Sequence, residues 1–357
     1  MALVTRGHPA RWWHVEGDGK VLCTLCPRYC RLADEQAGFC FIRKREGDAL
    51  VSLGYGRTTG FAVDPVEKKP LNHFLPGTTI LSFGTAGCNL GCRFCQNWDI
   101  SKARLDDERS REVSPDEVIE LAERQGCPSV AMTYNDPVIF AEFAVDVARA
   151  ARARGVRTVL VTAGYVTEEA RGELYENVDA ANVDLKAFTE DFYHRVCFAH
   201  LGPVLETLKW LHHETKVWVE VTNLMIPGLN DDEAETRRLA EWIATEMSPD
   251  VPLHLTAFHP DFKMLDRPHT PPSTLTRARS IAREVGLRHV YTGNVHDQDG
   301  QTTWCPCCGA AVIVRDWYRV APVGLSGGGC VACGAKIPGV FDVAVASPGR
   351  RRYLGLA

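Results

Sequence analysis

Residues 87–97 read Gly87-Cys88-Asn89-Leu90-Gly91-Cys92-Arg93-Phe94-Cys95-Gln96-Asn97, directly after the apolar run Thr79-Ile80-Leu81-Ser82-Phe83. The three cysteines follow a C-x3-C-x2-C spacing. An iron–sulfur cube held only by protein takes four thiolates and a structural zinc ion takes four ligands, so a compact group of three leaves one metal position open. Glycines at 84, 87 and 91 allow turns that residues with a Cβ resist. The loop can therefore wrap three sulfur atoms around one cluster. The alternative is three structural cysteines, or part of a zinc site whose fourth ligand is distant.

Composition limits the class of protein. The chain has 357 residues, 45% of them apolar, which predicts one large core with small appendages. Its net charge of -5 argues against general nucleic-acid binding. Because the sequence contains no apolar run of signal-peptide or membrane-spanning length, we expect a cytoplasmic protein with no membrane partner. Fourteen cysteines in such a chain favour metal binding over disulfides.

The first segment of the chain carries a second cysteine group, Cys23-x2-Cys26-x3-Cys30-x9-Cys40. Four cysteines make a complete ligand set, either for zinc or for an auxiliary [4Fe-4S] cluster, and the spacing does not separate the two. The linker 64–70 contains two prolines, which predict extended geometry. Cys127 and Cys197 stand alone and are expected to be buried free thiols.

The last segment carries the third group, in which Cys305-x2-Cys308 and Cys330-x2-Cys333 form two knuckles. Short strands are expected between them, around 312–314 and 318–320. This pattern predicts a zinc ribbon, with an auxiliary iron–sulfur cluster as the alternative. Cys307 is surplus to the set of four.

Between the two outer cysteine groups, short β-rich runs alternate with longer helical periodicity, which predicts repeated βα units. Ser114, Pro115 and Glu117 form a capping-box start for one helix. The predicted helices cover 115–125, 138–154, 168–176, 203–213, 232–247 and 273–285. The predicted strands cover 79–83, 129–134, 157–162, 179–185, 216–221 and 253–258. Six such units make an α/β fold, a parallel barrel or partial barrel, with its site at the carboxyl ends of the strands.

Polar residues follow several of these strands. Asn135 and Asp136 follow the second strand, Asp184 and Lys186 end the fourth, and His259 follows the sixth. Asp184 and Lys186 are two apart, so their side chains point to the same side of an extended strand. After the fifth strand, either Asn230 or Asp231 is expected to cap the next helix.

The cysteine loop resembles the cluster loop of radical S-adenosylmethionine (SAM) enzymes. The resemblance implies a partial (β/α)6 TIM-type barrel and a [4Fe-4S] cluster on Cys88, Cys92 and Cys95, whose free iron chelates SAM. It also implies reductive cleavage of SAM to a 5′-deoxyadenosyl radical, with an electron donor such as flavodoxin or ferredoxin as partner. The segments around Asn135 and Asp136 and around His259 resemble SAM contacts of the pyruvate formate-lyase activating enzymes, although Asp136 replaces a usual glutamate. The pair of Asp184 and Lys186 suits the carboxylate and ribose of SAM.

Nearly the full chain resembles the AmmeMemoRadiSam-system radical SAM enzymes. We therefore expect a cysteine-rich segment at 1–75, a radical SAM partial barrel at 76–300 and a zinc-ribbon-like domain at 301–357. The substrate that loses hydrogen is unknown; it is a small molecule, a protein or an RNA, or a glycyl-radical enzyme that is being activated. The alternative from another class is a non-catalytic metal-knuckle module that binds RNA or protein.

Overall fold

The computed structural model describes residues 7–105, 110–342 and 352–354. Within them nine strands form one sheet, in the order β16-β15-β14-β13-β12-β11-β9-β8-β22. Neighbours from β9 to β16 are parallel, whereas β8 and β22 pair antiparallel at one edge. The parallel strands are β9 (Thr79–Phe83), β11 (Ser129–Met132), β12 (Arg157–Thr162), β13 (Ala180–Asp184), β14 (Trp218–Met225), β15 (Leu253–Ala257) and β16 (Val290–Gly293).

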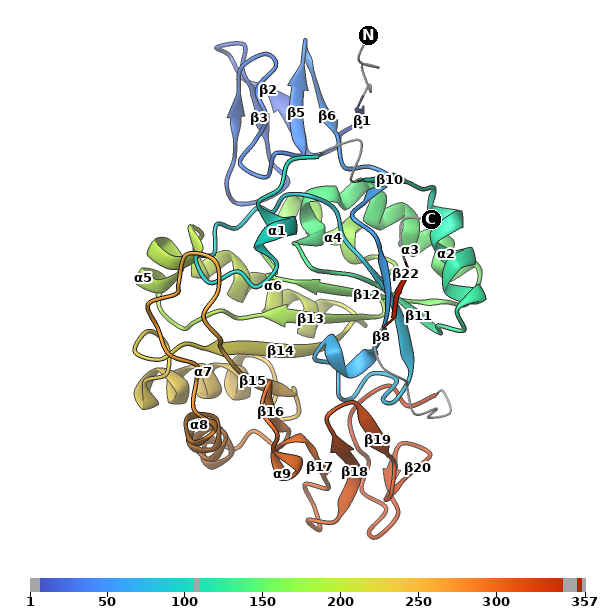
Figure 1. Cartoon of the computed structure of the whole chain (residues 1–357), viewed down its shortest axis with the longest axis vertical. Coiled ribbons are helices and arrows are strands. Elements are labelled where there is room, and N and C mark those ends of the chain that lie inside the picture. The colour runs from blue at the N-terminus through green and yellow to red at the C-terminus, as the bar shows by residue number, and fades with distance from the viewer. Residues whose placement is uncertain (1–6, 106–109, 343–351, 355–357) are drawn as a thin grey trace.

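The helices that connect successive parallel strands pack along the sheet (Figure 1). They bury one apolar face each, as Val118, Ile119 and Ala122 of α2 do. The expected capping box at Ser114 is confirmed, because its side chain accepts a hydrogen bond from Glu117 N and Pro115 is the first helical residue. These helices are α2 (Pro115–Arg124), α3 (Ala141–Ala153), α4 (Glu168–Tyr175), α6 (Leu201–Glu214), α7 (Glu233–Glu246) and α8 (Pro272–Val285).

The α/β prediction with parallel strands is confirmed, and the structure differs from the expected elements at two places. Strand β16 was not expected, because four residues between Arg288-His289 and Asn294 carry too little periodicity. In the linker, β8 (Phe61–Pro65) leads into the 3-10 helix η1 (Val66–Lys68), so the expectation of extended geometry through residue 70 is wrong. Pro65 precedes the first turn of η1, where a fixed φ is compatible with a helix.

The N-terminal residues form two small antiparallel sheets above the main sheet (Figure 1). Their buried residues, among them Leu25 and Ile42, belong to the same apolar cluster as the barrel core. A buried ion pair between Arg43 and Glu142 of α3, 2.8 Å apart, ties the segment down. The strands are β1 (His8–Pro9), β2 (Trp13–Val15), β3 (Val21–Cys23), β4 (Arg31–Leu32), β5 (Arg43–Glu46) and β6 (Ala49–Ser52).

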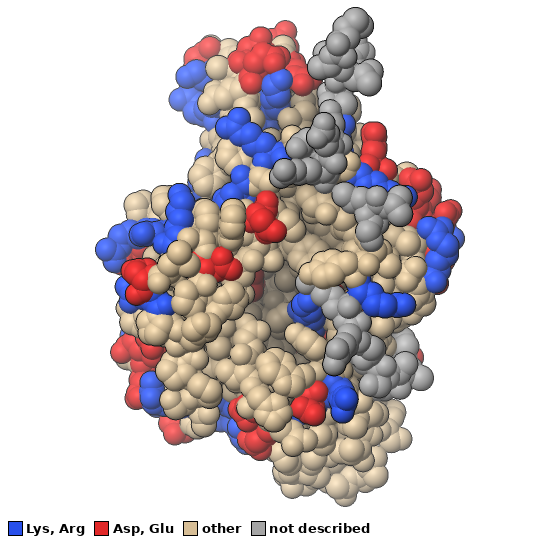
Figure 2. All heavy atoms as spheres, in the orientation of Figure 1, with Lys and Arg blue, Asp and Glu red and all other residues tan. Residues whose placement is uncertain are grey.

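The C-terminal residues form a small β domain below β16 (Figure 1). The expected strand pair is confirmed, since β18 and β19 are antiparallel. Figure 2 shows almost no charged side chains on the face of this domain that it draws, which gives nucleic acid no basic surface there. The elements are α9 (Gln298–Gln301), β17 (Thr303–Trp304), β18 (Ala311–Asp316), β19 (Arg319–Ala321), β20 (Leu325–Ser326) and β21 (Gly329–Cys330).

The main sheet extends beyond the range 76–300 that was expected to contain it. Strand β8 lies before that range and pairs with β9, and β22 (Arg352–Leu354) lies after it and pairs with β8. The remaining elements are short: β7 (Arg57–Thr58), β10 (Arg111–Glu112), α1 (Trp98–Ser101), the 3-10 helix η2 (Pro137–Phe140), α5 (Glu190–Phe192) and the π-helix η3 (Tyr193–Cys197). No described helix combines the length and apolar character needed to cross a bilayer.

Candidate functional site

A cavity of about 430 Å³ lies at the carboxyl ends of the parallel strands. Every parallel strand, or the loop after it, contributes to its wall, because the carboxyl ends of parallel strands meet at one edge of the sheet. All three cysteines of the loop after β9 line the cavity. The wall includes Cys88, Cys92, Cys95, Asn135, Asp136, Thr162, Asp184, Lys186, Thr222, His254, Thr256, Asn294, Arg315, Trp317 and Tyr318.

The cysteine loop packs closely against other segments of the chain at its glycines. Gly87 has a φ of 90°, and a Cβ there would lie 2.1 Å from the carbonyl oxygen of Cys40. Glycine is therefore required at this position both for conformation and for space. Gly84 and Gly91 have ordinary φ values and serve close approach instead, to Thr133 O and to Phe198. The expectation that all three glycines serve as turns is thus correct only at Gly87.

Asn135 ties the loop to the strand beside it. Its Nδ2 donates to Gly87 O over 2.9 Å, and its Oδ1 accepts from Thr85 N over 3.3 Å. Asn135 is 7% exposed and lines the cavity. The side chain therefore positions the cysteine loop in addition to facing the space where a ligand would lie.

The loop thiols sit in an environment suited to metal binding. Cys92 is buried, and Cys88 and Cys95 are partly buried. A hydrogen bond from Cys197 lowers the pKa of Cys92, against the effect of burial, and so favours the thiolate that binds metal. Cys127 and Cys197 are both buried, as expected for lone thiols.

The spread of the loop sulfurs tests whether they fit a cluster. Among the described His, Cys, Asp and Glu side chains, a group of three or more with ligand atoms all within 4.8 Å of one another occurs only at the C-terminal knuckles. The sulfur atoms of Cys88, Cys92 and Cys95 therefore do not all lie within that distance of one another. Such spacing fits a [4Fe-4S] cluster, in which each thiolate binds its own iron.

Asp136 is a buried anchor for the turn after β12. Its carboxylate accepts from Thr162 Oγ1 over 2.9 Å and from Ala163 N over 3.0 Å, and it also caps η2 at Val138 N. Burial raises the pKa of Asp136, although these hydrogen bonds lower it. The carboxylate faces the cavity with its oxygens already partnered within the protein.

The neighbouring Tyr134 has a left-handed backbone, with a φ of 73°, which is uncommon for a bulky residue. Its hydroxyl donates to Asp64 Oδ2 over 3.0 Å, and Lys69 Nζ lies 4.8 Å from the centre of its ring. Lys69 also pairs with Asp64 over 2.7 Å. Strand β8 and the segment after it therefore hold the strained turn that presents Asn135 and Asp136.

Asp184 and Lys186 form an ion pair at the end of β13, on the same side as expected from their spacing. Both line the cavity. Burial lowers the pKa of Lys186, but the Asp184 carboxylate and the Cys92 thiol together raise it by more. The net shift of the pKa is therefore upward. Lys186 consequently remains a cation beside the cysteine loop.

His259 is not brought to the cavity. It is exposed, and its ring lies beside that of His269. The histidine that lines the cavity is His254, five residues earlier on β15, whose Nε2 lies 2.7 Å from Glu220 Oε2. Burial raises the pKa of Glu220, but the bond with His254 and the nearby charges lower it to about 2. The alternation of His254 and Thr256 on one face of β15 is the sequence signal that could have identified this histidine.

The C-terminal domain closes one side of the cavity, which the sequence did not predict. Arg315 is 2% exposed and donates to Asn72 O over 2.6 Å and to Thr303 Oγ1 over 2.8 Å. Trp317 and Tyr318, at the turn after β18, also line the cavity. This wall depends on packing between segments more than 200 residues apart, so no local pattern could have revealed it.

Glu67, on η1, lies against this wall and provides a pH-dependent prediction. Its side chain is 4% exposed, and burial raises its pKa to about 7, although Arg315 Nε, 3.9 Å away, lowers it. Because the unfolded carboxyl titrates near 4.3, ionised Glu67 costs the fold up to about 4 kcal/mol once the pH exceeds 7. We expect Glu67→Gln to gain stability relative to the parent as pH rises from 5 to 8, measured by urea unfolding midpoints. A difference between the two proteins that does not vary with pH would contradict this.

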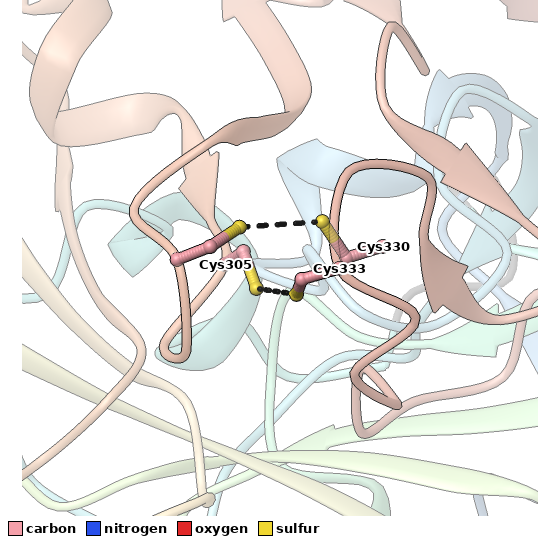
Figure 3. A group of neighbouring side chains, drawn as sticks. Cys305, Cys330 and Cys333 are labelled. Carbon is pink, nitrogen blue, oxygen red and sulfur yellow. Dashed lines mark hydrogen bonds between the residues drawn. The ribbon is translucent and has the colours of Figure 1, made fainter.

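The C-terminal knuckles bring four thiols together (Figure 3). Cys305 Sγ and Cys333 Sγ are 3.6 Å apart, and Cys308 Sγ and Cys330 Sγ are 3.7 Å apart. Tetrahedral zinc with bonds of about 2.3 Å separates its sulfur ligands by about 3.8 Å, so this set could bind zinc.

The expectation that Asn230 or Asp231 caps α7 is wrong. Asp232 caps this helix, because its side chain accepts a hydrogen bond from Glu235 N over 3.0 Å. Asn230 instead binds Lys186 O and Leu224 O, which joins the ends of β13 and β14.

The parallel sheet, the open cysteine loop after its first parallel strand and the cavity at its carboxyl edge define a metal-cofactor enzyme of the partial-barrel class. The radical SAM superfamily matches residues 83–240, from the end of β9 into α7. The uncharacterized protein MJ0808 of Methanocaldococcus jannaschii is 42% identical over 322 residues, which are 90% of this chain and 96% of that protein. The chain belongs to the radical SAM superfamily and is of the pyruvate formate-lyase-activase-like type.

Two further proteins are similar to this chain over part of its length. The pyruvate formate-lyase 1-activating enzyme of Escherichia coli K12 is 27% identical over 172 residues, which are 47% of this chain and 69% of the enzyme. A radical SAM methyltransferase from Sphaerobacter thermophilus superposes with a TM-score of 0.50 at 18% identity, over 61% of this chain and 67% of that one, a likeness of fold alone. Membership implies a [4Fe-4S] cluster and SAM as cofactors.

Proposed function

We propose that the protein is an enzyme that cleaves SAM reductively and uses the resulting radical to remove hydrogen from a substrate. The observation that carries this proposal is the cysteine loop. Its three thiols line the cavity at the carboxyl ends of the parallel strands and are spread too widely for a single ion. When bound, a [4Fe-4S] cluster would supply SAM chelation and the electron that yields methionine and a 5′-deoxyadenosyl radical.

The chain's own residues would hold and surround these cofactors. Cys88, Cys92 and Cys95 would ligate the cluster, and Asn135 would fix the loop that carries them through its bond to Gly87 O. Asp184 and Lys186 lie at the same rim and offer one charge of each sign, suited to the amino and carboxylate groups of SAM.

Asp136 remains among the proposed SAM contacts, and His254 takes the place of His259. Asp136 faces the cavity, so we retain it, although its bonds to Thr162 and Ala163 give it a role in shaping the turn as well. His259 is omitted because it lies outside the cavity, and His254 is the histidine in reach. A low-potential donor such as flavodoxin or ferredoxin would supply the electron, and a cytoplasmic location belongs to the same proposal.

The substrate class has two candidates. The similarity to pyruvate formate-lyase 1-activating enzyme favours a glycyl-radical partner protein. The cavity is bounded on one side by Arg315, Trp317 and Tyr318 of the C-terminal domain. This wall favours a substrate that fits inside the cavity and loses hydrogen directly to the radical. A glycyl radical detected by EPR on a partner would decide for activation, whereas deuterium transfer from another labelled molecule into 5′-deoxyadenosine would identify a direct substrate.

The first test is SAM cleavage. Protein purified and reconstituted anaerobically, with its iron measured, is expected to convert SAM to 5′-deoxyadenosine and methionine when dithionite is added. The products are measured by liquid chromatography with mass detection. Absence of 5′-deoxyadenosine from protein with an intact cluster would refute the proposal, and zinc alone, without iron–sulfur absorption, would favour the non-catalytic metal-knuckle module.

A further inference from the structure

The N-terminal cysteines converge on a cavity of their own, separate from the large one. Cys23 ends β3, Cys26 and Cys30 lie in the loop before β4, and Cys40 lies in the loop before β5. Cys23 and Cys40 are buried, and Cys26 and Cys30 are partly buried. The wall consists of Cys23, Leu25, Cys26, Arg28, Cys30, Gly38, Cys40, Arg43, Asn89, Val138 and Ile139.

The spacing of these four thiols differs from that of the C-terminal knuckles. At the knuckles all four sulfur atoms lie within 4.8 Å of one another, as the ligands of one zinc ion do. Among the described N-terminal cysteines no three meet that condition, although all four face one cavity. The four C-terminal cysteines are therefore as compact as the ligands of one ion, whereas the four N-terminal cysteines are less compact.

The wider set resembles the radical SAM loop instead. Cys88, Cys92 and Cys95 are also absent from the compact group, and they are the residues proposed above to ligate the first cluster. In an iron–sulfur cube the thiolates bind separate irons at different corners, so their sulfur atoms are farther apart than around one ion.

The two sulfur sites lie back to back. Asn89, which follows Cys88, is fully buried and forms part of the N-terminal wall. Arg28, from the same wall, donates to Asn89 O, and the backbone of Gly87 packs against Cys40 O. Val138 and Ile139 of η2 close the remaining side with apolar surface. The site is therefore built into the barrel, against the base of the cysteine loop.

We propose that Cys23, Cys26, Cys30 and Cys40 bind a second [4Fe-4S] cluster. With four thiolates the cluster has no open iron and does not chelate SAM, unlike the cluster on the cysteine loop. The compact C-terminal knuckles would bind zinc. The proposal stands on the geometry of the N-terminal cavity and does not require that the enzyme cleave SAM.

The test is the metal content of the whole protein, purified anaerobically and reconstituted with iron and sulfide. We expect about eight irons and one zinc per chain, measured by plasma mass spectrometry, because each cluster contributes four irons. Cys26→Ser/Cys30→Ser is expected to lose about four irons and keep zinc. The matched control, Cys305→Ser/Cys308→Ser, is expected to lose zinc and keep all the iron.

The radical SAM loop provides a second measurement that does not depend on folding of the N-terminal variant. In Cys88→Ala/Cys92→Ala/Cys95→Ala, about four irons and a [4Fe-4S] EPR signal after reduction are expected to remain. Protein with no iron and two zinc ions would overturn the proposal. If iron remains in this variant but the parent fails to cleave SAM, the proposed function fails while the second cluster stands.

Discussion

Cys92→Ala is expected to abolish SAM cleavage. Cys92 is the middle ligand of the loop, 8% exposed, and lines the cavity together with Cys88 and Cys95. Changes to residues that merely orient metal ligands typically cost 10–100-fold, so removal of a ligand is expected to lower 5′-deoxyadenosine formation by more than about 100-fold. The assay is product formation per chain under dithionite, together with the iron content of the same sample.

The matched control is Cys127→Ala. Cys127 is also buried, at 3% exposure, and the same atoms are removed, but it lies at the opposite end of the sheet, before β11. This variant is expected to retain the parent's iron and activity. Equal loss of activity in both variants would mean that truncation of any buried thiol inactivates the protein, and the loop would lose its assigned role.

The parts predicted correctly from sequence are those with a local cause. The run 79–83 is apolar, is followed by glycine, and forms β9; the capping box at Ser114 starts α2 where expected. The pairing of Asp184 with Lys186 follows from the two-residue period of a strand. In each case the decisive residues lie within a few positions of one another.

The parts that were missed depend on distant contacts. Arg315 reaches Asn72 across 243 positions, and His254, which lines the cavity, is bonded to Glu220 on the neighbouring strand. His259 was predicted to contact SAM because it follows a strand, but in the structure it is exposed and does not line the cavity. Position after a strand predicts the neighbourhood of a side chain, whereas register within the strand decides which way it points.

The cysteine groups show the same limit. Spacing along the chain predicted complete ligand sets at both ends and could not separate zinc from a cluster. In the structure the two sets differ, because among the described residues only the C-terminal sulfur atoms all lie within 4.8 Å of one another. The N-terminal set lies against Arg43, Val138 and Ile139, so its geometry depends on distant segments that no motif specifies.

Glu142→Gln is expected to destabilise the protein by about 3–5 kcal/mol, the usual cost of leaving one member of a buried ion pair uncompensated. Glu142 is fully buried, lies 2.8 Å from Arg43 Nη1, and also accepts from Arg11 N over 2.8 Å. Glutamine preserves shape and an acceptor but leaves the Arg43 guanidinium without its counter-charge. Urea unfolding midpoints of protein with matched metal content measure the effect.

Two controls separate charge from packing. Glu123→Gln removes the same charge from an exposed pair, with Arg154, and is expected to cost less than about 1 kcal/mol. Arg43→Met/Glu142→Leu removes both charges and is expected to recover much of the loss, because replacing a whole buried pair with apolar side chains is often neutral. A double variant as unstable as Glu142→Gln would contradict this, and it would mean that the hydrogen bonds of Arg43 to the N-terminal backbone, rather than its charge, hold that segment on the barrel.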